Sequence, residues 1–296
     1  MSADCATPPV PFAMAPLPLV AAFDGGRLTS DGGLPWLAEA EAATELCAAF
    51  AAVIPEWRRG AVRHSREALV RQRVFQSACG YADQDDADTL RHDPLLKLIC
   101  GRLPVGDPAL ASQPTFSRLE NAVTRQGCYR LAVALVELSL RERGRAGRPA
   151  RLVLDLDSTA DPTHGDQEGT ADHAHYRQHM YHTLLVFDGD TGQLITAVLR
   201  PGNAPASGGV VAVLKRLVPA LRGRWPGIPI EVRADGGFAT PALYTFCEEG
   251  LAYTIGLPSN ARLARLAAPL LAAAQARQAA SPDPAATTVR LVGETA

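Results

Sequence analysis

The sequence predicts an α/β protein in which a mixed sheet carries helices on its faces and follows a mostly α-helical N-terminal region. In the first half of the 296 residues, apolar positions recur at helical spacing. In the second half, short apolar runs of strand length alternate with helical patterns. The polar stretch RERGRAGRPAR (141–151) separates the two halves. We therefore expect an irregular, proline-rich lead over 1–30, a helical region over 31–142 that is a candidate for DNA binding, and a sheet-containing core over 151–296.

The first half is assigned to helices joined by polar loops. Asp31 is the expected N-cap of the first helix, because it precedes Gly32, Gly33 and an apolar periodic run. Residues 101–114 contain three prolines and are expected to form a loop. The predicted helices cover 34–54, 65–79, a short stretch from about Asp86, 115–123 and 129–140.

The second half is assigned to five strands and three helices. Ser207 is the expected N-cap of the first helix, and Thr240 is the expected N-cap of a second helix that runs to Glu249. The alanine-rich segment 263–280, which contains two arginines, is read as a soluble helix. The first helix carries an apolar stripe on a single face, made of Val210, Val211, Leu214, Leu217, Val218 and Leu221. Residues 188–192, DGDTG, form the turn of a predicted hairpin. The predicted strands cover 151–157, 181–187, 193–199, 229–234 and 251–257.

This order of elements, β, β, β, α, β, α, β, is ribonuclease-H-like. In that arrangement the first strand lies beside the strand that follows the first helix. The first of these two ends in LVLDLDST and delivers Asp155 and Asp157, and the second ends in IEVRADGGF and delivers Asp235. We therefore expect Asp157 and Asp235 to emerge at the same edge of the sheet.

Composition restricts the function only weakly. The formal net charge is -2 and the pI is about 6.4, so the overall charge does not point to nucleic acid. Six scattered cysteines without a CxxC pair fit a reduced, cytoplasmic protein. The N-terminal stretch lacks the pattern of a signal peptide, and we expect no membrane span.

Carboxylates at two rigid strand ends are suited to Mg²⁺ chemistry. Mg²⁺ prefers oxygen ligands, commonly one or two carboxylates with water and substrate phosphate. Metal ions held in this way activate a water or a hydroxyl group and stabilise the leaving oxygen of a phosphodiester. The alternative for each motif alone is structural: Asp155 as a polar residue of a strand end, and Asp235 as a turn former before Gly236 and Gly237.

Two rival interpretations concern other metal chemistry. The segment DLDST (155–159) matches the DxDxT signature of haloacid-dehalogenase-type phosphotransferases, with Asp155 as nucleophile and Asp157 as general acid/base. Such enzymes also need a lysine and a later acidic pair, which the sequence offers poorly. A second metal site is conceivable in the polar segment 161–182, although its spacing matches no zinc pattern. Its members are His164, Asp166, Glu168, Asp172, His173, His175, His179 and His182.

Arginines form two clusters that could contact the phosphates of DNA. Salt-dependent backbone binding follows if they face DNA, and the alternative is a solvated surface. The first cluster contains Arg58, Arg59, Arg63, Arg66, Arg71 and Arg73, and the second contains Arg141, Arg143, Arg145, Arg148 and Arg151.

Several long motifs carry a resemblance to a known family. They are LTSDGGL (28–34), CGYADQDDADTLRHDPLLK (79–97), ASQPTFSRLEN (111–121), LDLDSTADPTHGDQEG (154–169), LRPGNAPAS (199–207) and RADGGFA (233–239). With them the chain resembles DDE-type transposases of bacterial insertion sequences, of the group 1 kind, closest to the insertion-sequence family numbered 1380. The resemblance implies cut-and-paste transposition with Mg²⁺ or Mn²⁺, binding of double-stranded DNA at terminal inverted repeats, and homo-oligomeric synaptic complexes.

Carried over residue by residue, the resemblance makes Asp157 the first catalytic and metal-binding carboxylate and Asp235 the second. The family's third acid lies on a helix after a further β-rich segment, in a Tyr–Arg–Lys/Glu context. Glu294 lacks that context and is not assigned the role. The expectation is therefore a C-terminally truncated transposase that is inactive or a regulatory remnant.

Overall fold

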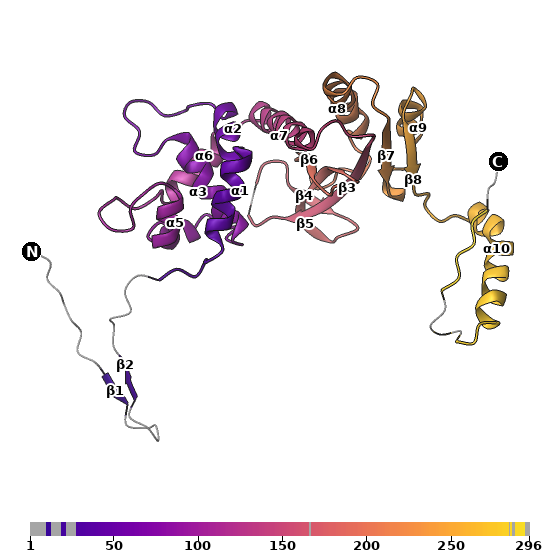
Figure 1. The fold of residues 1–296 in the computed structure, drawn as a ribbon, viewed down its shortest axis with the longest axis horizontal. Coiled ribbons are helices and arrows are strands. Elements are labelled where there is room, and N and C mark those ends of the chain that lie inside the picture. Colours follow the sequence, from indigo (N-terminus) through magenta and orange to yellow (C-terminus); the bar gives the residue numbers. More distant parts are fainter. Residues whose placement is uncertain are drawn as a thin grey trace, which may run out of the picture. The chain divides into compact units, whose positions relative to one another are not determined.

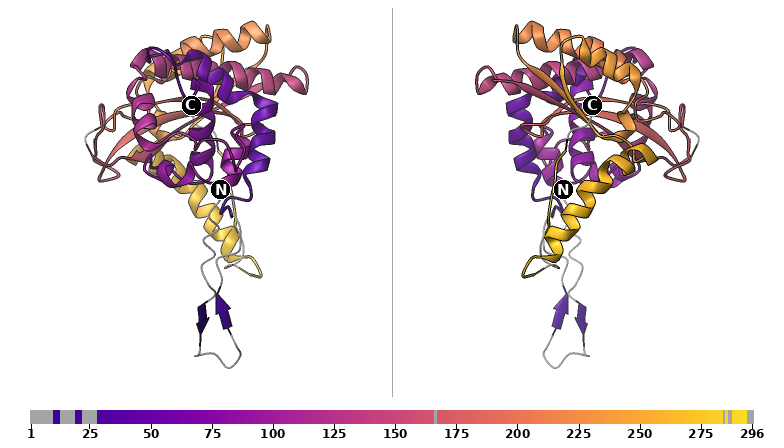
Figure 2. Two further views of the ribbon diagram at one scale, coloured as in Figure 1. Left: turned by 90° about the vertical axis from the view of Figure 1, so that its left-hand side faces the viewer. Right: turned by 90° about the vertical axis from the view of Figure 1, so that its right-hand side faces the viewer.

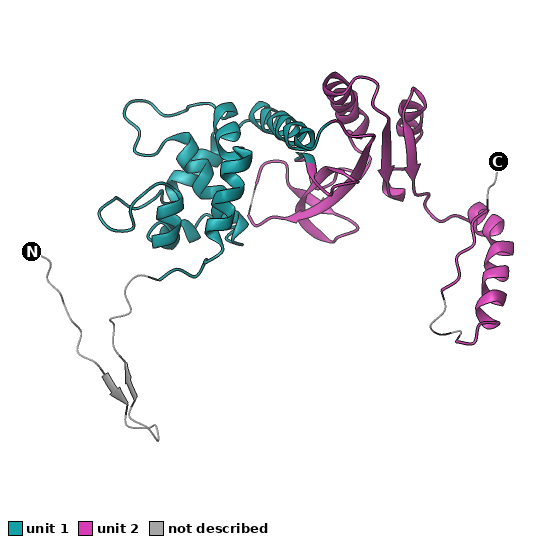
Figure 3. Ribbon diagram, viewed as in Figure 1, with its two compact units in different colours: residues 1–147, 195–198 teal, residues 148–194, 199–296 magenta. Residues whose placement is uncertain are grey.

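The computed structural model describes residues 28–165, 167–283, 285 and 288–293, together with the backbone of strands β1 (Val10–Phe12) and β2 (Leu19–Ala21). Most of the expected lead over 1–30 lies outside these residues. The chain divides into two compact units (Figure 3). Unit 1 comprises Met1–Gly147 and Ile195–Val198, and unit 2 comprises Arg148–Leu194 and Leu199–Ala296.

Unit 1 is built mainly of helices (Figure 1). They are α1 (Leu34–Thr44), α2 (Leu46–Val53), α3 (Arg66–Ala78), α4 (Asp86–Leu90), α5 (Pro94–Ile99), α6 (Gln113–Asn121) and α7 (Arg125–Arg145). Its core is apolar and includes Leu69 and Phe116, both fully buried. A buried glutamine, Gln72, exchanges two hydrogen bonds with the backbone of Ala111, 2.8 and 3.0 Å long, and thereby fixes the loop before α6 on α3.

The helices of unit 1 agree with the sequence prediction in type but not at every boundary. The helix predicted over 65–79 is α3, and Ser65 is its N-cap, accepting a hydrogen bond from Ala68 N. The single helix expected over 34–54 is wrong, because Glu45 adopts a left-handed conformation with φ 57° and divides it into α1 and α2. Asp31 is not the N-cap of α1: that position is Gly33, and the Asp31 carboxylate instead accepts a hydrogen bond from the Tyr81 hydroxyl.

Unit 2 contains a mixed sheet. Its strands follow the order β4 (Ala171–His173), β5 (Gln178–Asp188), β3 (Leu152–Pro162), β7 (Ile230–Ala234) and β8 (Ala252–Ile255). β3 and β5 are antiparallel, whereas β3 with β7 and β7 with β8 are parallel. The two long strands β3 and β5 run side by side (Figure 2). The predicted mixed sheet, with the first strand beside the strand that follows the first helix, is confirmed.

The hairpin turn after β5 forms where the sequence predicts it. Asp188 N donates a 2.8 Å hydrogen bond to Gln193 O, and Gly192 takes the positive φ, 73°, that closes the turn. Strand β6 (Leu194–Val198) follows, and all of it except Leu194 is assigned to unit 1. β4 is not predicted from the sequence, because it lies within the His-rich segment that reads as a polar loop.

Three helices complete unit 2: α8 (Val210–Arg224), α9 (Pro241–Glu248) and α10 (Ala261–Ala279). The predicted apolar stripe of α8 is buried at Val210, Leu214 and three further positions. Ser207 is not its N-cap, since Gly209 holds that position with φ 76°. Thr240 caps α9 as predicted. α10 has no buried residue, and among the described residues no helix is long and apolar enough to cross a membrane.

Candidate metal centre on two adjacent parallel strands

Two adjacent parallel strands bring the predicted carboxylates to equivalent places. The β3–β7 register pairs Leu152 with Ile230 and ends with Leu156 opposite Ala234. Asp157 is the next residue on the first strand, and Asp235 is the next residue after the second. β3 continues beyond Asp157 to Pro162 in its pairing with β5, so the predicted strand end at residue 157 is wrong. The β3–β7 register nevertheless places the two carboxylates at equivalent positions of adjacent strands, although they are far apart in sequence.

The local backbone holds each carboxylate by one oxygen. Asp157 Oδ1 accepts a 2.7 Å hydrogen bond from Ser158 N, and Asp235 Oδ1 accepts a 2.9 Å bond from Gly237 N at the start of the 3₁₀ turn Gly236–Phe238. Both aspartates are exposed, and within the described part of the chain neither forms an ion pair. Each therefore presents an oxygen that is available to a cation.

Asp155 lies on the same face of β3 as Asp157, because side chains on a strand alternate between faces. Its two carboxylate oxygens are bound by Nε and Nη2 of Arg233, which stands opposite it on β7. This pair raises the pKa of Arg233. Gly189 closes over the pair, since a Cβ on this glycine would lie 2.9 Å from Asp155 Oδ2. Asp155 thus cross-links two strands, and the arrangement does not support a nucleophile at this position.

The donor set suits a hard divalent cation with few protein ligands. Two carboxylates at equivalent positions of adjacent strands, with water and phosphate in the remaining positions, are a ligand set that Mg²⁺ accepts. Among the residues that the structure describes, no group of three or more His, Cys, Asp or Glu side chains is arranged to hold a metal ion. Glu294, to which the resemblance assigns no role, lies outside the described residues, as does Asp166.

The His-rich segment forms local contacts instead of a metal centre. The rings of His173 and His182 meet edge to face, with centroids 4.8 Å apart, and Tyr176 packs on both. His182 Nδ1 lies 2.7 Å from the carbonyl of Ala204. His179 Nδ1 lies 3.2 Å from Asp172 Oδ1. These interactions fix β4 and the following turn against β5 and leave the metal interpretation of this segment without support.

Most of the arginines in the first predicted cluster bind the protein's own acceptors. Arg58 and Arg66 both lie near Glu56, and the Arg58 hydrogen bond lowers the pKa of that carboxyl group to about 2. Arg71 pairs with Glu67, and Arg73 pairs with Glu120 while donating to the carbonyls of Tyr81 and Ala82.

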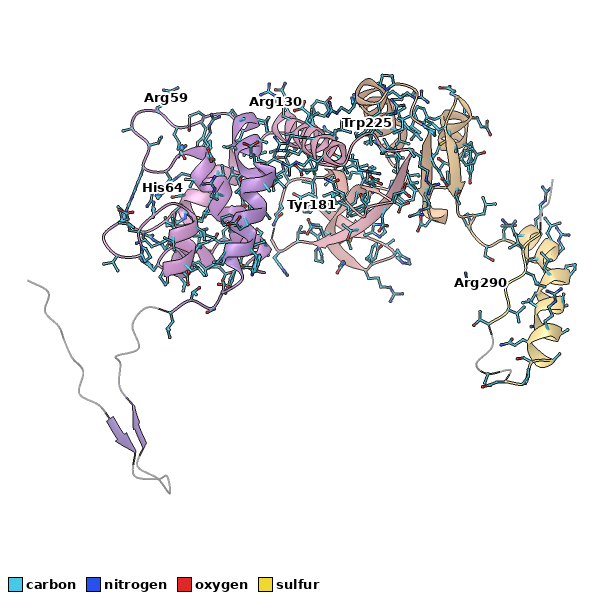
Figure 4. The ribbon with its side chains drawn as sticks, viewed as in Figure 1. Arg59, His64, Arg130, Tyr181, Trp225 and Arg290 are labelled. Carbon is cyan, nitrogen blue, oxygen red and sulfur yellow. The ribbon has the colours of Figure 1, made fainter. Side chains whose placement is uncertain are left out.

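Two arginines of this cluster have a different environment. Arg59 and Arg63 belong to the loop between α2 and α3, are exposed, and form no ion pair among the described residues. Figure 4 shows the Arg59 side chain projecting outward from this loop.

The second arginine cluster is divided between the units. Arg141, Arg143 and Arg145 lie in the last turns of α7 in unit 1, so this part of the expected polar break is helical. Arg141 pairs with Glu45, and Arg145 pairs with Glu142. The remaining members belong to unit 2: Arg148 Nη2 donates to Pro226 O, and Arg151 contacts Asp190 and Glu231.

One buried residue of this region is not predicted from the sequence. Arg200, within the LRPGNAPAS motif, is 7% exposed and donates to the Ser158 hydroxyl, next to Asp157. The sequence signal for this role is that Arg200 lies within a long motif. The residues that accept its five hydrogen bonds are far apart along the chain, and no local sequence pattern connects them.

Comparisons with known proteins identify a family. No curated protein matches the chain. Among solved structures, a piggyBac transposase in a synaptic complex with hairpin DNA is similar, with 12% identity and a TM-score of 0.32. The similarity covers 76% of this chain and 43% of that one, so this chain spans less than half the length of that protein. The family model described as "Transposase DDE domain group 1" matches residues 14–294, and the chain therefore belongs to this transposase family.

Proposed function

We propose that this protein acts in DNA-mediated transposition of a bacterial insertion sequence, with Asp157 and Asp235 as its metal-binding catalytic carboxylates. The observation that supports this most directly is the β3–β7 register, in which both aspartates follow the pair Leu156 and Ala234. Family membership supports the same reaction class. The substrate is double-stranded DNA carrying terminal inverted repeats, and the working form is a homo-oligomer that brings two ends together.

The two aspartates would hold Mg²⁺ or Mn²⁺ through their carboxylate oxygens. Such an ion, when bound, activates the attacking oxygen and stabilises the leaving oxygen of a phosphodiester. The residues of the chain supply the rest: hydrogen bonds from Ser158 N and Gly237 N orient the two carboxylates.

We assign the phosphate contacts to arginines that form no ion pair within the described part of the protein. Arg59 and Arg63 fit this role best, because they are exposed on a loop without an ion pair in the described residues. The other predicted arginines contribute less to DNA binding, since a carboxylate or a carbonyl already occupies their donors. The expected binding is electrostatic and salt-dependent.

We further propose that the described residues bind metal and DNA without completing cleavage. They contain no group of three acidic, His or Cys ligands. Loss of a single group that stabilises transition-state charge costs about 10²- to 10³-fold in rate. On this basis the chain in isolation acts as a DNA-binding, regulatory form of the transposase.

The test combines metal binding with DNA cleavage. Mn²⁺ binding to the whole chain, measured by calorimetry, should be lost in Asp157→Asn and in Asp235→Asn and retained in Asp155→Asn. A terminal-repeat duplex should be retarded at low salt and remain uncut in Mg²⁺. Robust nicking by the wild type that is abolished in Asp157→Ala would contradict the proposal that the chain is a regulatory form. Unchanged Mn²⁺ binding in both asparagine variants would contradict the proposed metal site.

A further inference from the structure

Arg200 lies buried beneath the candidate site with all its hydrogen bonds directed at neutral groups. Its Nε donates to His182 O on β5 at 2.8 Å, and its Nη2 donates to Ser158 Oγ on β3 at 2.9 Å. Its Nη1 donates to the carbonyls of the loop before α8, namely Pro205, Ala206 and Gly208, at 2.8 to 3.3 Å. In the described part of the chain no carboxylate pairs with this guanidinium.

A buried charge without a counterion is costly, and full hydrogen bonding by carbonyl oxygens offsets that cost only when the geometry is fixed. Burial correspondingly lowers the pKa of Arg200. Only a guanidinium offers five donors in one rigid plane; an ammonium group has three and cannot span the same set of acceptors. Arg200 therefore ties β3, β5 and the 205–208 loop together at one point.

The contact with β3 falls directly beside the first carboxylate. Ser158 follows Asp157, and successive side chains of a strand point to opposite faces. Arg200 thus holds β3 at Ser158 from the face opposite to the one on which the Asp157 side chain stands. Fixing Ser158 fixes the peptide whose N–H binds Asp157 Oδ1.

The same loop reaches the second carboxylate. A Cβ built on Gly237 would lie 3.1 Å from the Cβ of Ala206, so the 205–208 loop packs against the turn that follows Asp235. Gly237 N is the donor that binds Asp235 Oδ1. One guanidinium is therefore linked to the backbone donors of both carboxylates, through Ser158 on one side and through Ala206 on the other.

We propose that Arg200 is a positioning residue that sets the spacing of Asp157 and Asp235, and with it the affinity of their metal site. The proposal rests on the proposed function, because it assigns a role toward the same two carboxylates. It also gives the LRPGNAPAS motif a physical role, since the arginine and its acceptor loop form one structural unit. Residues that orient metal ligands in this way commonly affect metal affinity by about 10- to 100-fold.

The test measures Mn²⁺ affinity by calorimetry and backbone hydrogen exchange by mass spectrometry in the whole chain. Arg200→Lys keeps the charge but cannot make all five contacts. It should weaken Mn²⁺ binding by about 10-fold or more and accelerate exchange in peptides covering 156–162 and 203–209. The milder Ser158→Ala removes one acceptor and should weaken Mn²⁺ binding several-fold, even where Arg200→Lys unfolds the protein. Arg222→Lys, an exposed arginine on α8 that donates to Gly250 O, is the matched control and should change neither measurement.

Wild-type Mn²⁺ affinity in both Arg200→Lys and Ser158→Ala would overturn the proposal. So would unchanged exchange in the two peptides of Arg200→Lys. The Asp157→Asn variant separates this proposal from the proposed function. If this variant binds Mn²⁺ like the wild type, the proposed metal site fails, whereas the exchange measurement still decides whether Arg200 holds the two segments.

Discussion

His64 is placed among positive charges in unit 1. Its Nδ1 lies 3.0 Å from Nη2 of Arg102, which can only donate, so the ring is neutral with Nδ1 as acceptor. Burial, followed by the charges of Arg102, Arg63, Arg58 and Arg91, lowers the pKa of His64 from 6.5 to about 4. In the unfolded chain the same imidazole takes up a proton near its ordinary pKa.

This depressed pKa predicts a stability change in a defined pH window. A histidine that stays neutral when folded stabilises the protein above its unfolded pKa, and that contribution is lost as the pH falls from about 6.5 to about 4. Melting temperature measured from pH 7 to pH 4 should therefore fall more steeply in the wild type than in His64→Gln. Parallel curves for the two proteins would contradict the assignment.

Substitution should distinguish the structural role of Asp155 from the proposed metal-binding role of Asp157. Asp155 and Arg233 are 29% and 49% exposed, so solvent screens their bidentate pair, and Asp155→Asn should lower the unfolding free energy only modestly, but by more than Asp157→Asn does. Asp157 has no ion pair in the described residues, and Asp157→Asn should change stability by less than about 0.5 kcal/mol. Urea denaturation gives both values, and the reverse ranking would refute the structural role of Asp155.

At the scale of elements, Gly202 allows a loop to pass directly over two strands. A Cβ at this position would collide with the carbonyl oxygens of Met180 on β5 and Ala171 on β4. Both obstacles are backbone, which cannot rotate away, so Gly202→Ala should destabilise the protein by about 1–3 kcal/mol. In the helical control Gly223→Ala a Cβ meets nothing within 4 Å, and the variant should gain about 0.5–1 kcal/mol. Equal stabilities in urea would contradict this packing.

Elements whose cause is local were predictable, and those fixed from a distance were not. The α8 stripe and the Thr240 cap follow from residues within one or two turns, so periodicity and capping preferences suffice. The break at Glu45 is different, because glutamate favours helices and its left-handed conformation coincides with a pair to Arg141, 96 residues away. No local pattern marks such a residue.

The same distinction applies to the site at the scale of the whole molecule. Asp157 and Asp235 could be predicted, because each follows an apolar strand-forming run and the order of elements makes those strands neighbours, although β3 extends beyond Asp157 to Pro162. The sequence could not show which arginines of the two clusters are free to contact DNA. Arg73 is bound by Glu120, 47 residues further along, and only the folded chain shows that its charge is already used. Net charge and sequence clustering therefore overestimate the surface that is free to bind phosphate.

This leads to a prediction for DNA binding by the whole chain. Each phosphate contact contributes about 0.9 to the slope of log affinity against log salt concentration. The double variant Arg59→Ala/Arg63→Ala should therefore lower the magnitude of this slope by about 1.8, measured by fluorescence anisotropy on duplex DNA. Arg71→Ala/Arg73→Ala removes the same charge from residues paired with Glu67 and Glu120 and should lower the melting temperature while leaving the slope nearly unchanged.

A control pair of arginines on another element tests whether the salt slope depends only on net charge. Arg262 and Arg265 are exposed on α10. Replacing both with alanine should give the same slope of log affinity against log salt concentration as the wild type. If all three double variants reduce the slope equally, DNA responds to total charge and the loop between α2 and α3 is not its contact. If only Arg59→Ala/Arg63→Ala reduces it, phosphate binding is local to that loop, because a lost contact changes the number of released counterions whereas a lost internal ion pair does not.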